Sequence, residues 1–546
     1  MHAEDSRRIA RWHFRMDPDA RRVFFVRPPA GITAERAQEL AFEPNLLVVV
    51  REEVGAPRIV GREHYSMPHV LWEISPAMLD AARIGAVAKP PGFDAGLWEE
   101  VPAPDDVEPF CIQRMTLDNY RCFQARNLVF QRGFNVLIGG NGSGKTAVLD
   151  ALAEVFRRAI HALSGQESAT MLSIEDVRVA AFQRAEVPVE EPQYPAEISP
   201  AFALFGDEMG GEYGWRVRSE HGGTWMGTGR VLSSLNVLDF ARLSVQSGYD
   251  VPLPVFAYYR TSRAWADSSA TNGGAHDERS RLTGYTGWDR PAVDIRPLEH
   301  WWNRMELLRA QRGVSLGVLD AVRATVVRSL GSDYDDVRFD AELQGLAAKR
   351  AGGPWMPFRR LSDGARNMFG MVADLAVRCA RLNPHFGHQA PEKTSGIVLV
   401  DELDLHLHPS WQRRIIGDLR TAFPLVQFIA TTHSPLILQS LHGGSLISLD
   451  QGTWEHPADR SIEDILELDM GIPMPQKSRR FQEMVAAAAE YQRALEGVKQ
   501  ITSEQKEVLK RRLDVLMEPY GDNPAYVAFL QLKRVASNLD AEVETP

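Results

Sequence analysis

The residues with the clearest chemistry are the eight from Gly139 to Thr146, which read Gly-Gly-Asn-Gly-Ser-Gly-Lys-Thr. Their spacing fits the pattern G-x-x-x-x-G-K-[ST], a loop in which glycines let backbone N–H groups curl around an anion. An apolar run, Phe134 to Ile138, precedes the loop, and an amphipathic helical pattern follows it. Because a helix N-terminus adds its dipole, the stretch predicts a phosphate site in which Lys145 reaches the β- and γ-phosphates and Thr146 ligates magnesium.

Two carboxylates follow a second apolar run. Residues 396 to 400 read Gly-Ile-Val-Leu-Val and lead directly into Asp401 and Glu402. Such a run is expected of a central parallel strand buried on both faces. Carboxylates at its C-terminal end lie where open α/β sheets keep their ligands, a place for a metal ligand and for a group that orients water. The alternative for Glu402 is a carboxylate at the start of a helix.

Two shorter motifs complete the set. Leu361-Ser362-Asp363-Gly364 opens a helical pattern, and a Ser-x-Gly helix start is ready to bind an anion, although a cap of this kind taken alone is usually structural. A further strand pattern, residues 426 to 430, ends in Thr431-Thr432-His433-Ser434-Pro435.

These four motifs, in this order, resemble those of the ABC-type ATPase heads of the SMC, RecF and Rad50 group. Within that group the chain is most similar to the OLD-like ATPases, in which a His-Leu-His-Pro segment like residues 405 to 409 follows the acidic pair. The resemblance covers about residues 110 to 450. It implies an α/β fold, namely a P-loop ATPase head with a mixed sheet, helices on both faces and a helical signature lobe. It also implies that the protein hydrolyses ATP with Mg²⁺.

The resemblance gives roles to matching positions. The residues that would cradle the phosphates are Gly139, Asn141, Gly142, Ser143, Gly144 and Lys145. Thr146 and Asp401 would hold Mg²⁺, Glu402 would polarise the attacking water, and His433 would sense the γ-phosphate. Arg121 lies in a segment like the family's aromatic-Arg-Ser motif and would line the nucleotide, although Cys122 stands where the family has serine.

Ser362 and Gly364 have a different role in such heads, because their helix caps the ATP bound by a second copy. The sequence supplies one head per chain. A homodimer or larger even assembly is therefore expected.

Length and pattern predict three units: an α+β appendage at 1–108, the ATPase head at 109–450 with its signature lobe at about 294–390, and a helical unit at 451–546. Strands are predicted at residues 23–26, 46–50 and 70–74 of the appendage, with short helices at 33–41 and 76–82. Residues 294–345 look mostly helical, with helices at 298–308 and 316–330. A loop rich in glycine, serine and aspartate, 268–287, is predicted to be mobile.

Composition narrows the class of protein. A hydrophobic share of 44% and a charged share of 24% are ordinary for a soluble globular protein. The polar start and the lack of a run of about 18 apolar residues predict a cytoplasmic protein with no membrane span. The net charge of −11 argues against a protein that coats nucleic acid over its whole surface. Cys111, Cys122 and Cys379 have no C-x-x-C spacing and are expected to be buried, with neither a disulfide nor a zinc site.

The sequence also bears on biological role. Tyr258-Tyr259-Arg260-Thr261, the His-Leu-His-Pro segment and the helical C-terminus resemble the ATPase subunits of Septu and retron anti-phage systems, where the ATPase gates a nuclease encoded beside it. Neither a Toprim pattern nor a His-Asn-His cluster is recognisable. The sequence thus predicts an ATPase without its own nuclease site, a nuclease partner chain, and DNA or RNA as a further partner.

The alternative is a RecF- or SMC-like repair or recombination ATPase that clamps DNA, although residues 165–360 lack the sustained heptads of a coiled coil. The glutamine that couples metal to the middle lobe in such heads is not located, and Gln183 is not assigned to that role.

Overall fold

A computed structural model of the chain describes the residues that carry every predicted motif. The described residues are 22–26, 46–50, 58–62, 69–74, 98–101, 110–164, 172–184, 187–203, 217–220, 223–225, 241–242, 245–246, 250–261, 280–290, 295–450, 452–454, 460–470, 483, 486–487, 490 and 503–517. Contacts divide the chain into two units, Met1–Asp459 and Arg460–Pro546. Within the described part, no helix combines the length and the apolar character needed to cross a bilayer.

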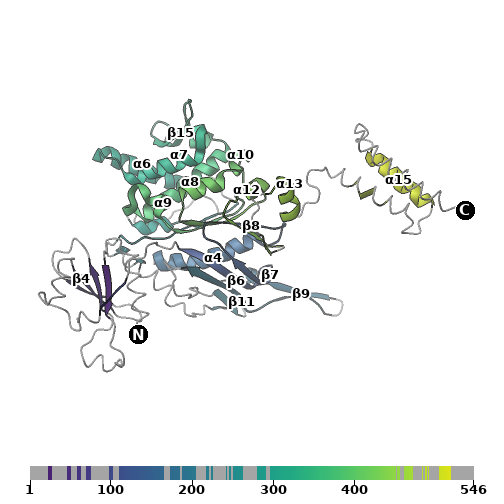
Figure 1. Cartoon of the computed structure of the whole chain (residues 1–546), viewed down its shortest axis with the longest axis horizontal. Helices are drawn as coiled ribbons and strands as arrows, with labels where there is room; N and C mark the ends of the chain where they lie inside the picture. Colours follow the sequence, from purple (N-terminus) through teal and green to yellow (C-terminus); the bar gives the residue numbers. More distant parts are fainter. Residues whose placement is uncertain are drawn as a thin grey trace, which may run out of the picture. The chain divides into compact units, whose positions relative to one another are not determined.

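The centre of the head is a six-stranded sheet in the order β14-β18-β19-β8-β20-β21 (Figure 1). Five strands run parallel: β14 (Val255–Tyr259), β18 (Gly396–Val400), β19 (Val426–Thr431), β8 (Phe134–Ile138) and β20 (Ser445–Ser448). The edge strand β21 (Gly452–Trp454) is antiparallel, so the mixed sheet predicted from the sequence is confirmed. Every residue of the five parallel strands is buried, which explains why their sequences are mostly apolar.

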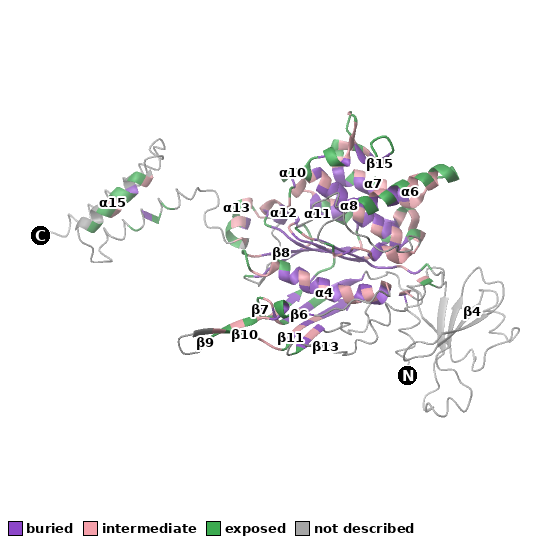
Figure 2. Ribbon diagram, turned by 180° about the vertical axis from the view of Figure 1, so that it is seen from behind, coloured by how far each residue is buried: buried purple, intermediate pink, exposed green. Residues whose placement is uncertain are grey.

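Helix α4 (Lys145–Ser164) covers one face of this sheet, while α8 (Asp363–Leu382) packs on the other (Figure 2). The far side of α4 lies against a second, antiparallel sheet in the order β13-β12-β11-β6-β7. Its strands are β6 (Cys111–Tyr120), β7 (Phe123–Val129), β11 (Ala196–Ala203), β12 (Val217–Glu220) and β13 (Gly223–Trp225). The β6–β7 pair is an antiparallel hairpin that turns at residues 121 and 122.

An aromatic cluster joins the three layers. Phe156 on α4 lies with its ring centroid 5.3 Å from that of Phe256 on β14 and 6.3 Å from that of Phe202 on β11. Phe110, just before β6, contacts the same two rings at 5.5 and 5.4 Å. All four side chains are at most 1% exposed, so the cluster fixes α4 between the two sheets.

The remaining lobe combines helices with a small sheet. Helices α6 (Arg296–Arg312) and α7 (Gly317–Leu330) precede α8, as the sequence predicts. Three antiparallel strands, β15 (Tyr334–Asp340), β16 (Gly345–Arg350) and β17 (Trp355–Pro357), connect α7 to α8. The expectation that residues 294–345 are mostly helical is therefore wrong beyond residue 333. Strand β15 contains aspartates at 335, 336 and 340, a residue type that is depleted in strands, and pairing with β16 overrides that preference.

The N-terminal appendage contains a sheet in the order β3-β4-β2-β1-β5. Its strands are β1 (Arg22–Val26), β2 (Leu46–Val50), β3 (Arg58–Arg62), β4 (His69–Ile74) and β5 (Trp98–Val101), which confirms the three predicted strands. The predicted helices at 33–41 and 76–82 lie outside the described residues. In the C-terminal unit, α15 (Ser503–Met517) forms as its apolar spacing predicts.

Two smaller expectations need correction. Cys111 and Cys379 are buried as expected, whereas Cys122 is exposed, because it lies in the turn between β6 and β7. Of the loop predicted to be mobile, residues 268–279 lie outside the described residues, and its described end forms a 3-10 helix, η3 (Arg281–Tyr285). Its buried Tyr285 hydroxyl donates to the Pro254 carbonyl oxygen at 2.8 Å, which ties this end of the loop to the start of β14.

Gly396 provides a test of the strand arrangement. A Cβ atom there would lie 2.0 Å from the Val255 carbonyl oxygen, at a φ of +152°. Gly396→Ala should therefore lower the free energy of unfolding by about 3 kcal/mol or more, because the paired backbone of Val255 cannot move aside to relieve the clash. Gly417→Ala is the matched control: Gly417 is exposed on α11 (Ile415–Ala422), and a Cβ there meets nothing within 4 Å. That variant should gain roughly 0.5–1 kcal/mol. Chemical denaturation of both variants makes the comparison, and equal stability would contradict the β14–β18 pairing.

Candidate nucleotide site

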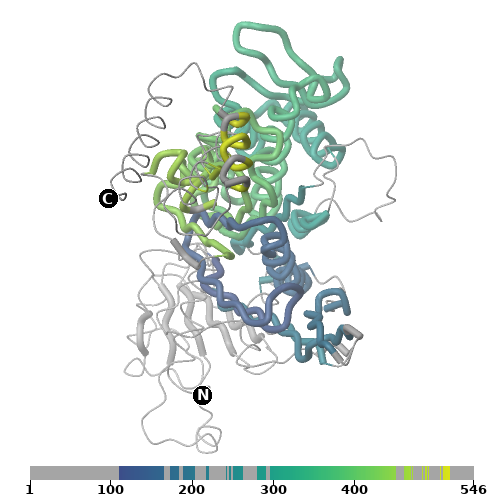
Figure 3. The backbone as a smooth tube through the Cα atoms, turned by 90° about the vertical axis from the view of Figure 1, so that its right-hand side faces the viewer, coloured from purple at the N-terminus to yellow at the C-terminus, as the bar shows by residue number. Residues whose placement is uncertain are grey.

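The parallel strands bring the predicted motifs to one edge. Their registers align Tyr259 with Val400, Val400 with Ala430, Thr431 with Leu137, and Ile138 with Ser448. The residues that follow the five strand ends are Arg260, Asp401, Thr432, Gly139 and Leu449. Segments near residues 138 and 431 thus lie side by side although they are distant in sequence (Figure 3), and the segment near residue 400 is the next along this edge. Ligands of open α/β sheets bind at this edge.

The phosphate loop has the form that its sequence predicts. Gly144 has φ +94°, and a Cβ on it would lie 2.5 Å from Phe123 and 2.6 Å from the Cys122 sulfur, so only glycine fits between the β6–β7 turn and α4. At the start of α4, the Val148 N–H donates a hydrogen bond to the Gly144 carbonyl oxygen, four residues earlier, at 2.9 Å. The N–H groups of the preceding helical residues have no carbonyl of α4 to bond and face an incoming anion.

Lys145 lies within this loop. Its ammonium donates to the carbonyl oxygens of Gly139 at 2.8 Å and Gly140 at 3.0 Å. Partial burial lowers the pKa of Lys145 below its ordinary value, while the carboxylates of Asp450, Asp401 and Glu402 act in the opposite direction. The predicted lysine and the predicted acidic pair therefore belong to one electrostatic site. Asp450, which sequence reasoning missed, also accepts from Gly140 N–H at 2.7 Å.

Asp401 joins the loop to the central strands. The Thr146 hydroxyl donates to Asp401 Oδ2 at 3.2 Å, across 255 residues of sequence. The Thr431 hydroxyl donates to the other oxygen, Oδ1, at 2.7 Å, and accepts from Glu402 N–H at 2.7 Å. Asp401 is 4% exposed, so its carboxylate has a fixed orientation. Thr431 was quoted in the sequence analysis as part of a motif, but it was given no role there.

This pair of oxygen donors fits Mg²⁺. Magnesium in nucleotide sites takes one or two protein oxygens and completes its shell with phosphate and water. No group of three or more His, Cys, Asp or Glu side chains within the described residues could hold a metal ion by itself. Thr146 and Asp401 match the first arrangement, because they offer a hydroxyl and a carboxylate at the mouth of the phosphate loop.

Glu402 and the segment after it have a strained backbone. Glu402 and His406 have φ values of +51° and +60°, which for residues other than glycine costs of order 1–3 kcal/mol each. The bond from Glu402 N–H to Thr431 stabilises the first of these conformations. The strain turns the chain sharply out of β18, and it leaves Glu402 partly exposed at the strand edge beside Asp401.

His433 is exposed at the end of β19, and its position is fixed through its backbone. Its N–H and the Thr432 hydroxyl both donate to Asp404 Oδ1, the first at 3.2 Å. The Ser434 hydroxyl donates to Gln412 Oε1 at 2.7 Å. Asp404 therefore connects the acidic segment to the histidine. The sequence signal that could have identified Asp404 is its position, three residues after Asp401 in a turn beyond a buried strand.

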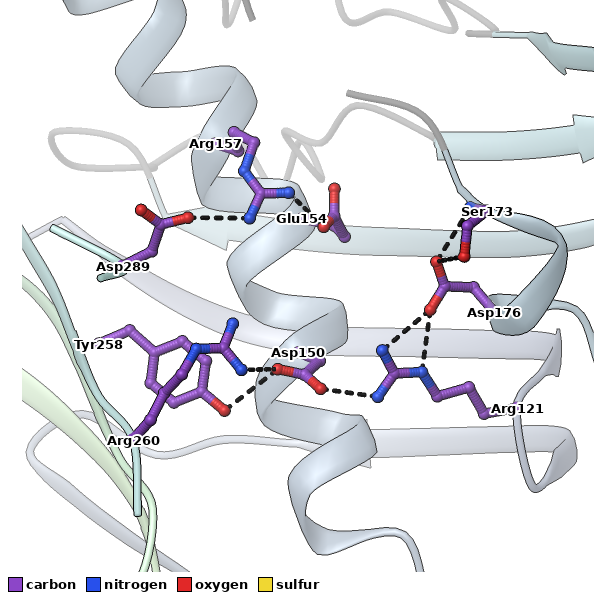
Figure 4. A network of polar contacts seen from close by, with 9 residues as sticks. All are labelled: Arg121, Asp150, Glu154, Arg157, Ser173, Asp176, Tyr258, Arg260 and Asp289. Carbon is purple, nitrogen blue, oxygen red and sulfur yellow. Dashed lines mark hydrogen bonds and ion pairs between the residues drawn. The ribbon is translucent and has the colours of Figure 1, made fainter. Parts of the chain in front are cut away.

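Arg121 lies in an ionic network along α4 (Figure 4). Its guanidinium donates to Asp150 Oδ2 at 2.6 Å and, through Nε, to Asp176 Oδ1 at 2.9 Å. Asp150 also accepts from the Tyr258 hydroxyl and from Arg260. Arg121 is thus held one helical turn beyond Thr146, and its contact with a nucleotide stays a prediction. Asp150 and Asp176 were not singled out from the sequence, and Arg260 was quoted there within a motif but without a role in the site.

Ser362 and Gly364 begin α8 as predicted. The Ser362 hydroxyl accepts from Ala365 N–H at 3.4 Å, and Ser362 itself is exposed. The first turn of α8 packs on the acidic segment of the same chain. Asn367 donates to the Leu405 carbonyl oxygen at 2.8 Å, and a Cβ on Gly364 would lie 2.7 Å from the His406 carbonyl oxygen.

Comparison with known proteins finds two protein families that match segments of the chain. Residues 256–439 match the family described as "AAA domain, putative AbiEii toxin, Type IV TA system", and residues 114–180 match a second AAA domain family. The chain is 37% identical over 115 residues to "Retron Vc95 probable ATPase" of Vibrio cholerae serotype O1 biovar El Tor, covering 21% of this chain and 22% of that protein. It is 43% identical over 93 residues to "Retron Ec83 probable ATPase" of Escherichia coli, covering 17% of each.

A third relative is "Septu protein PtuA" of Bacillus mycoides (strain KBAB4), 40% identical over 89 residues, which is 16% of this chain and 12% of that protein. The chain thus matches less than a quarter of the length of each of these relatives. Among solved structures, an SMC head bound to the C-winged helix domain of ScpA aligns with 63% of this chain and 95% of its own, at 16% identity and a TM-score of 0.38. The recombination mediator RecF aligns with 63% of this chain and 96% of its own, at 11% identity and a TM-score of 0.31.

The two family matches contain all the motifs of the site. The phosphate loop lies within residues 114–180, and the α8 cap, the acidic pair and His433 lie within 256–439. The parallel sheet joins both segments at one edge. The two matched segments therefore belong to AAA domain families, and parts of the chain are similar to retron ATPases and to Septu protein PtuA.

Proposed function

We propose that this protein binds ATP with Mg²⁺ and hydrolyses it to ADP and phosphate. The observation that carries the proposal is the hydrogen bond between Thr146 and Asp401, because it joins the phosphate loop to the acidic strand end. Lys145 lies in the field of the same carboxylates, Asp401 and Glu402. Phosphoryl transfer requires mainly positioning and charge neutralisation, and these groups supply both.

Each residue then has one task. Lys145 and the first N–H groups of α4 bind the β- and γ-phosphates, and Arg121 lines the nucleotide. Thr146 and Asp401 hold Mg²⁺, which when bound neutralises phosphate charge. Glu402 polarises the attacking water, and His433 contacts the γ-phosphate. Thr431 and Asp404 support this arrangement, since they orient Asp401 and the backbone of His433 respectively.

The proposal includes a second copy of the chain. Ser362 and Gly364 would cap the ATP held by a partner's phosphate loop, so that two heads enclose two nucleotides. Support comes from the exposed N-terminus of α8, a 20-residue helix whose dipole favours an anion. Its first turn packs on the acidic segment of its own site, so a partner's phosphate at the cap would lie close to the residues that follow Glu402.

The biological role that we propose is control of a nuclease partner in anti-phage defence, in the cytoplasm and with DNA or RNA as the nuclease target. Its support is the similarity to retron and Septu proteins, over 115, 93 and 89 residues. A RecF-like role as a clamp on DNA in repair is the second candidate. It is favoured by a 51% identical match to "DNA replication and repair protein RecF" of Mannheimia succiniciproducens, which covers only 41 residues.

Glu402→Gln tests the hydrolysis chemistry. Loss of the carboxylate should slow turnover by about 10²–10⁴-fold while ATP binding persists, because general-base assistance is removed and the phosphate contacts remain. Phosphate release and nucleotide titration measure the two quantities. Light scattering should detect an ATP-dependent dimer that accumulates in this variant. Glu342→Gln, an exposed glutamate in the β15–β16 turn, is the matched control. Hydrolysis at the parent rate in the Glu402 variant would place the base elsewhere.

Co-purification tests the biological role. The tagged chain, expressed from its native operon, should bring down a nuclease, and the activity of that nuclease on DNA or RNA should differ between ATP and ADP. Mass measurement identifies the partner and its stoichiometry. Recovery of recombination proteins instead, together with ATP-dependent binding to duplex ends or gaps, would favour the repair alternative and contradict the defence role.

A further inference from the structure

Arg260 lies at the ligand edge, and the motif Tyr258-Tyr259-Arg260-Thr261 that contains it gave it no role in the site. It is the first residue after β14, and β14 lies directly beside β18. The Asp401 N–H donates to the carbonyl oxygen of Tyr259 at 2.8 Å, so the backbone of Arg260 begins next to the proposed magnesium ligand. Gln183, to which the sequence analysis assigned no role, lies elsewhere, on β9 (Val179–Arg184), which pairs with β10 (Val187–Pro192) in a separate two-stranded sheet. The residue at the end of β14 is an arginine.

The guanidinium of Arg260 is turned toward α4 (Figure 4). Its Nη1 donates to Asp150 Oδ1 at 2.7 Å, and the group stacks over the Tyr258 ring at 4.2 Å from the centroid. The Tyr258 hydroxyl donates to the same Asp150 oxygen at 3.2 Å. Arg260 nevertheless keeps 27% of its side chain exposed.

Asp150 connects this cation to the nucleotide site. It lies four residues after Thr146 on α4, hence on the same face and about 6 Å further along the axis. Arg121 bonds its other oxygen at 2.6 Å. Two arginines, one from each sheet, thus converge on one carboxylate a single helical turn from the hydroxyl that we propose as a magnesium ligand.

The strand that carries Arg260 is anchored on the face opposite to Asp150. Tyr259, the preceding residue, points to the opposite face, where its hydroxyl donates to Asp374 Oδ2 of α8 at 2.8 Å. Arg378 donates to that same oxygen at 2.7 Å. Burial raises the pKa of the Tyr259 phenol well above its ordinary value, so this bond stays in place at physiological pH. A change at Arg260 is therefore a side-chain rotation about a fixed strand.

We propose that Arg260 is a phosphate-binding residue of this site that distinguishes a triphosphate from a diphosphate. The inference rests on the ATP-binding function proposed above. Asp150 holds the guanidinium while the site is empty, and a γ-phosphate oxygen replaces Asp150 as the acceptor. The exchange is between two anions, so the arginine stays paired throughout, and Asp150 keeps Arg121 as its counter-ion. Guanidinium suits this task because its planar fork matches phosphate oxygens.

The test compares nucleotide affinities in full-length variants. Arg260→Ala should raise the dissociation constant for a non-hydrolysable ATP analogue with Mg²⁺ about tenfold or more, as expected for loss of a hydrogen bond to a charged group. Its dissociation constant for ADP should change less than about twofold, since ADP lacks the group that Arg260 binds. Arg260→Lys keeps the charge and should recover part of the loss. Isothermal titration measures each constant.

Arg157→Ala is the matched control. Arg157 is also on α4 and 26% exposed, and it pairs with Glu154 and with Asp289 at 2.9 Å. It lies 11 residues beyond Thr146, about 16 Å further along the helix, where no phosphate reaches. This variant removes a comparable ion pair and should leave the ratio of the two affinities unchanged. Thermal unfolding of each variant verifies that it is folded.

The outcomes separate the two proposals. An equal loss of ATP and ADP affinity in Arg260→Ala would mean that Arg260 only supports α4, and unchanged affinity for both would mean that it has no part in the site. Either result overturns the assignment of Arg260 while ATP binding by the parent stands. A parent protein that binds neither nucleotide would contradict the proposed function itself, before any variant is compared.

Discussion

The structure depends on the carboxylate of Asp401 held between two hydroxyl groups. Thr146 approaches one oxygen from the phosphate loop, and Thr431 approaches the other from the neighbouring strand. Both contacts require β18, β19 and β8 to lie in parallel and in register, because a shift of one residue would turn each side chain to the other face of the sheet. The geometry of the site is therefore a direct result of strand pairing between segments that are some 250 residues apart in sequence.

Helix α4 transmits this geometry to the rest of the head. Its first turn forms the anion site, its second turn carries Asp150, and its later turns enter the aromatic cluster through Phe156. Strand β14 has a corresponding role on the other side, since Tyr258 bonds Asp150 on α4 while Tyr259 bonds Asp374 on α8. The phosphate loop and the cap that we assign to a partner's nucleotide are thus linked through one strand. A rigid connection of this kind is what an ATP-dependent switch between two heads requires.

Local patterns in the sequence predict most of this fold. The phosphate loop, strands β18 and β19, and helices α7 and α8 each follow from apolar spacing within one segment. Arg260, Asp404 and Asp150 do not, because their roles arise from which strand ends and which helical turns become neighbours in space. The exposure of Cys122 could not be predicted for the same reason, because it depends on where the β6–β7 turn lies in space, next to Gly144. Strand β15 was missed because its three aspartates weaken the strand signal in the sequence, and its pairing with β16 overrides that local preference.

The central claim is that ATP lies between two copies of the head, bound by Lys145 of one and capped by Ser362 of the other. Mixing two inactive variants tests it most directly. Lys145→Ala removes the phosphate-loop cation, while Ser362→Asp keeps a residue that caps helices well but places a negative charge against the partner's phosphate. Each variant alone should lack ATPase activity. In an equal mixture, half of the dimers contain one intact composite site of two, so about a quarter of the parent rate should return. A mixture as inactive as its components would contradict the account.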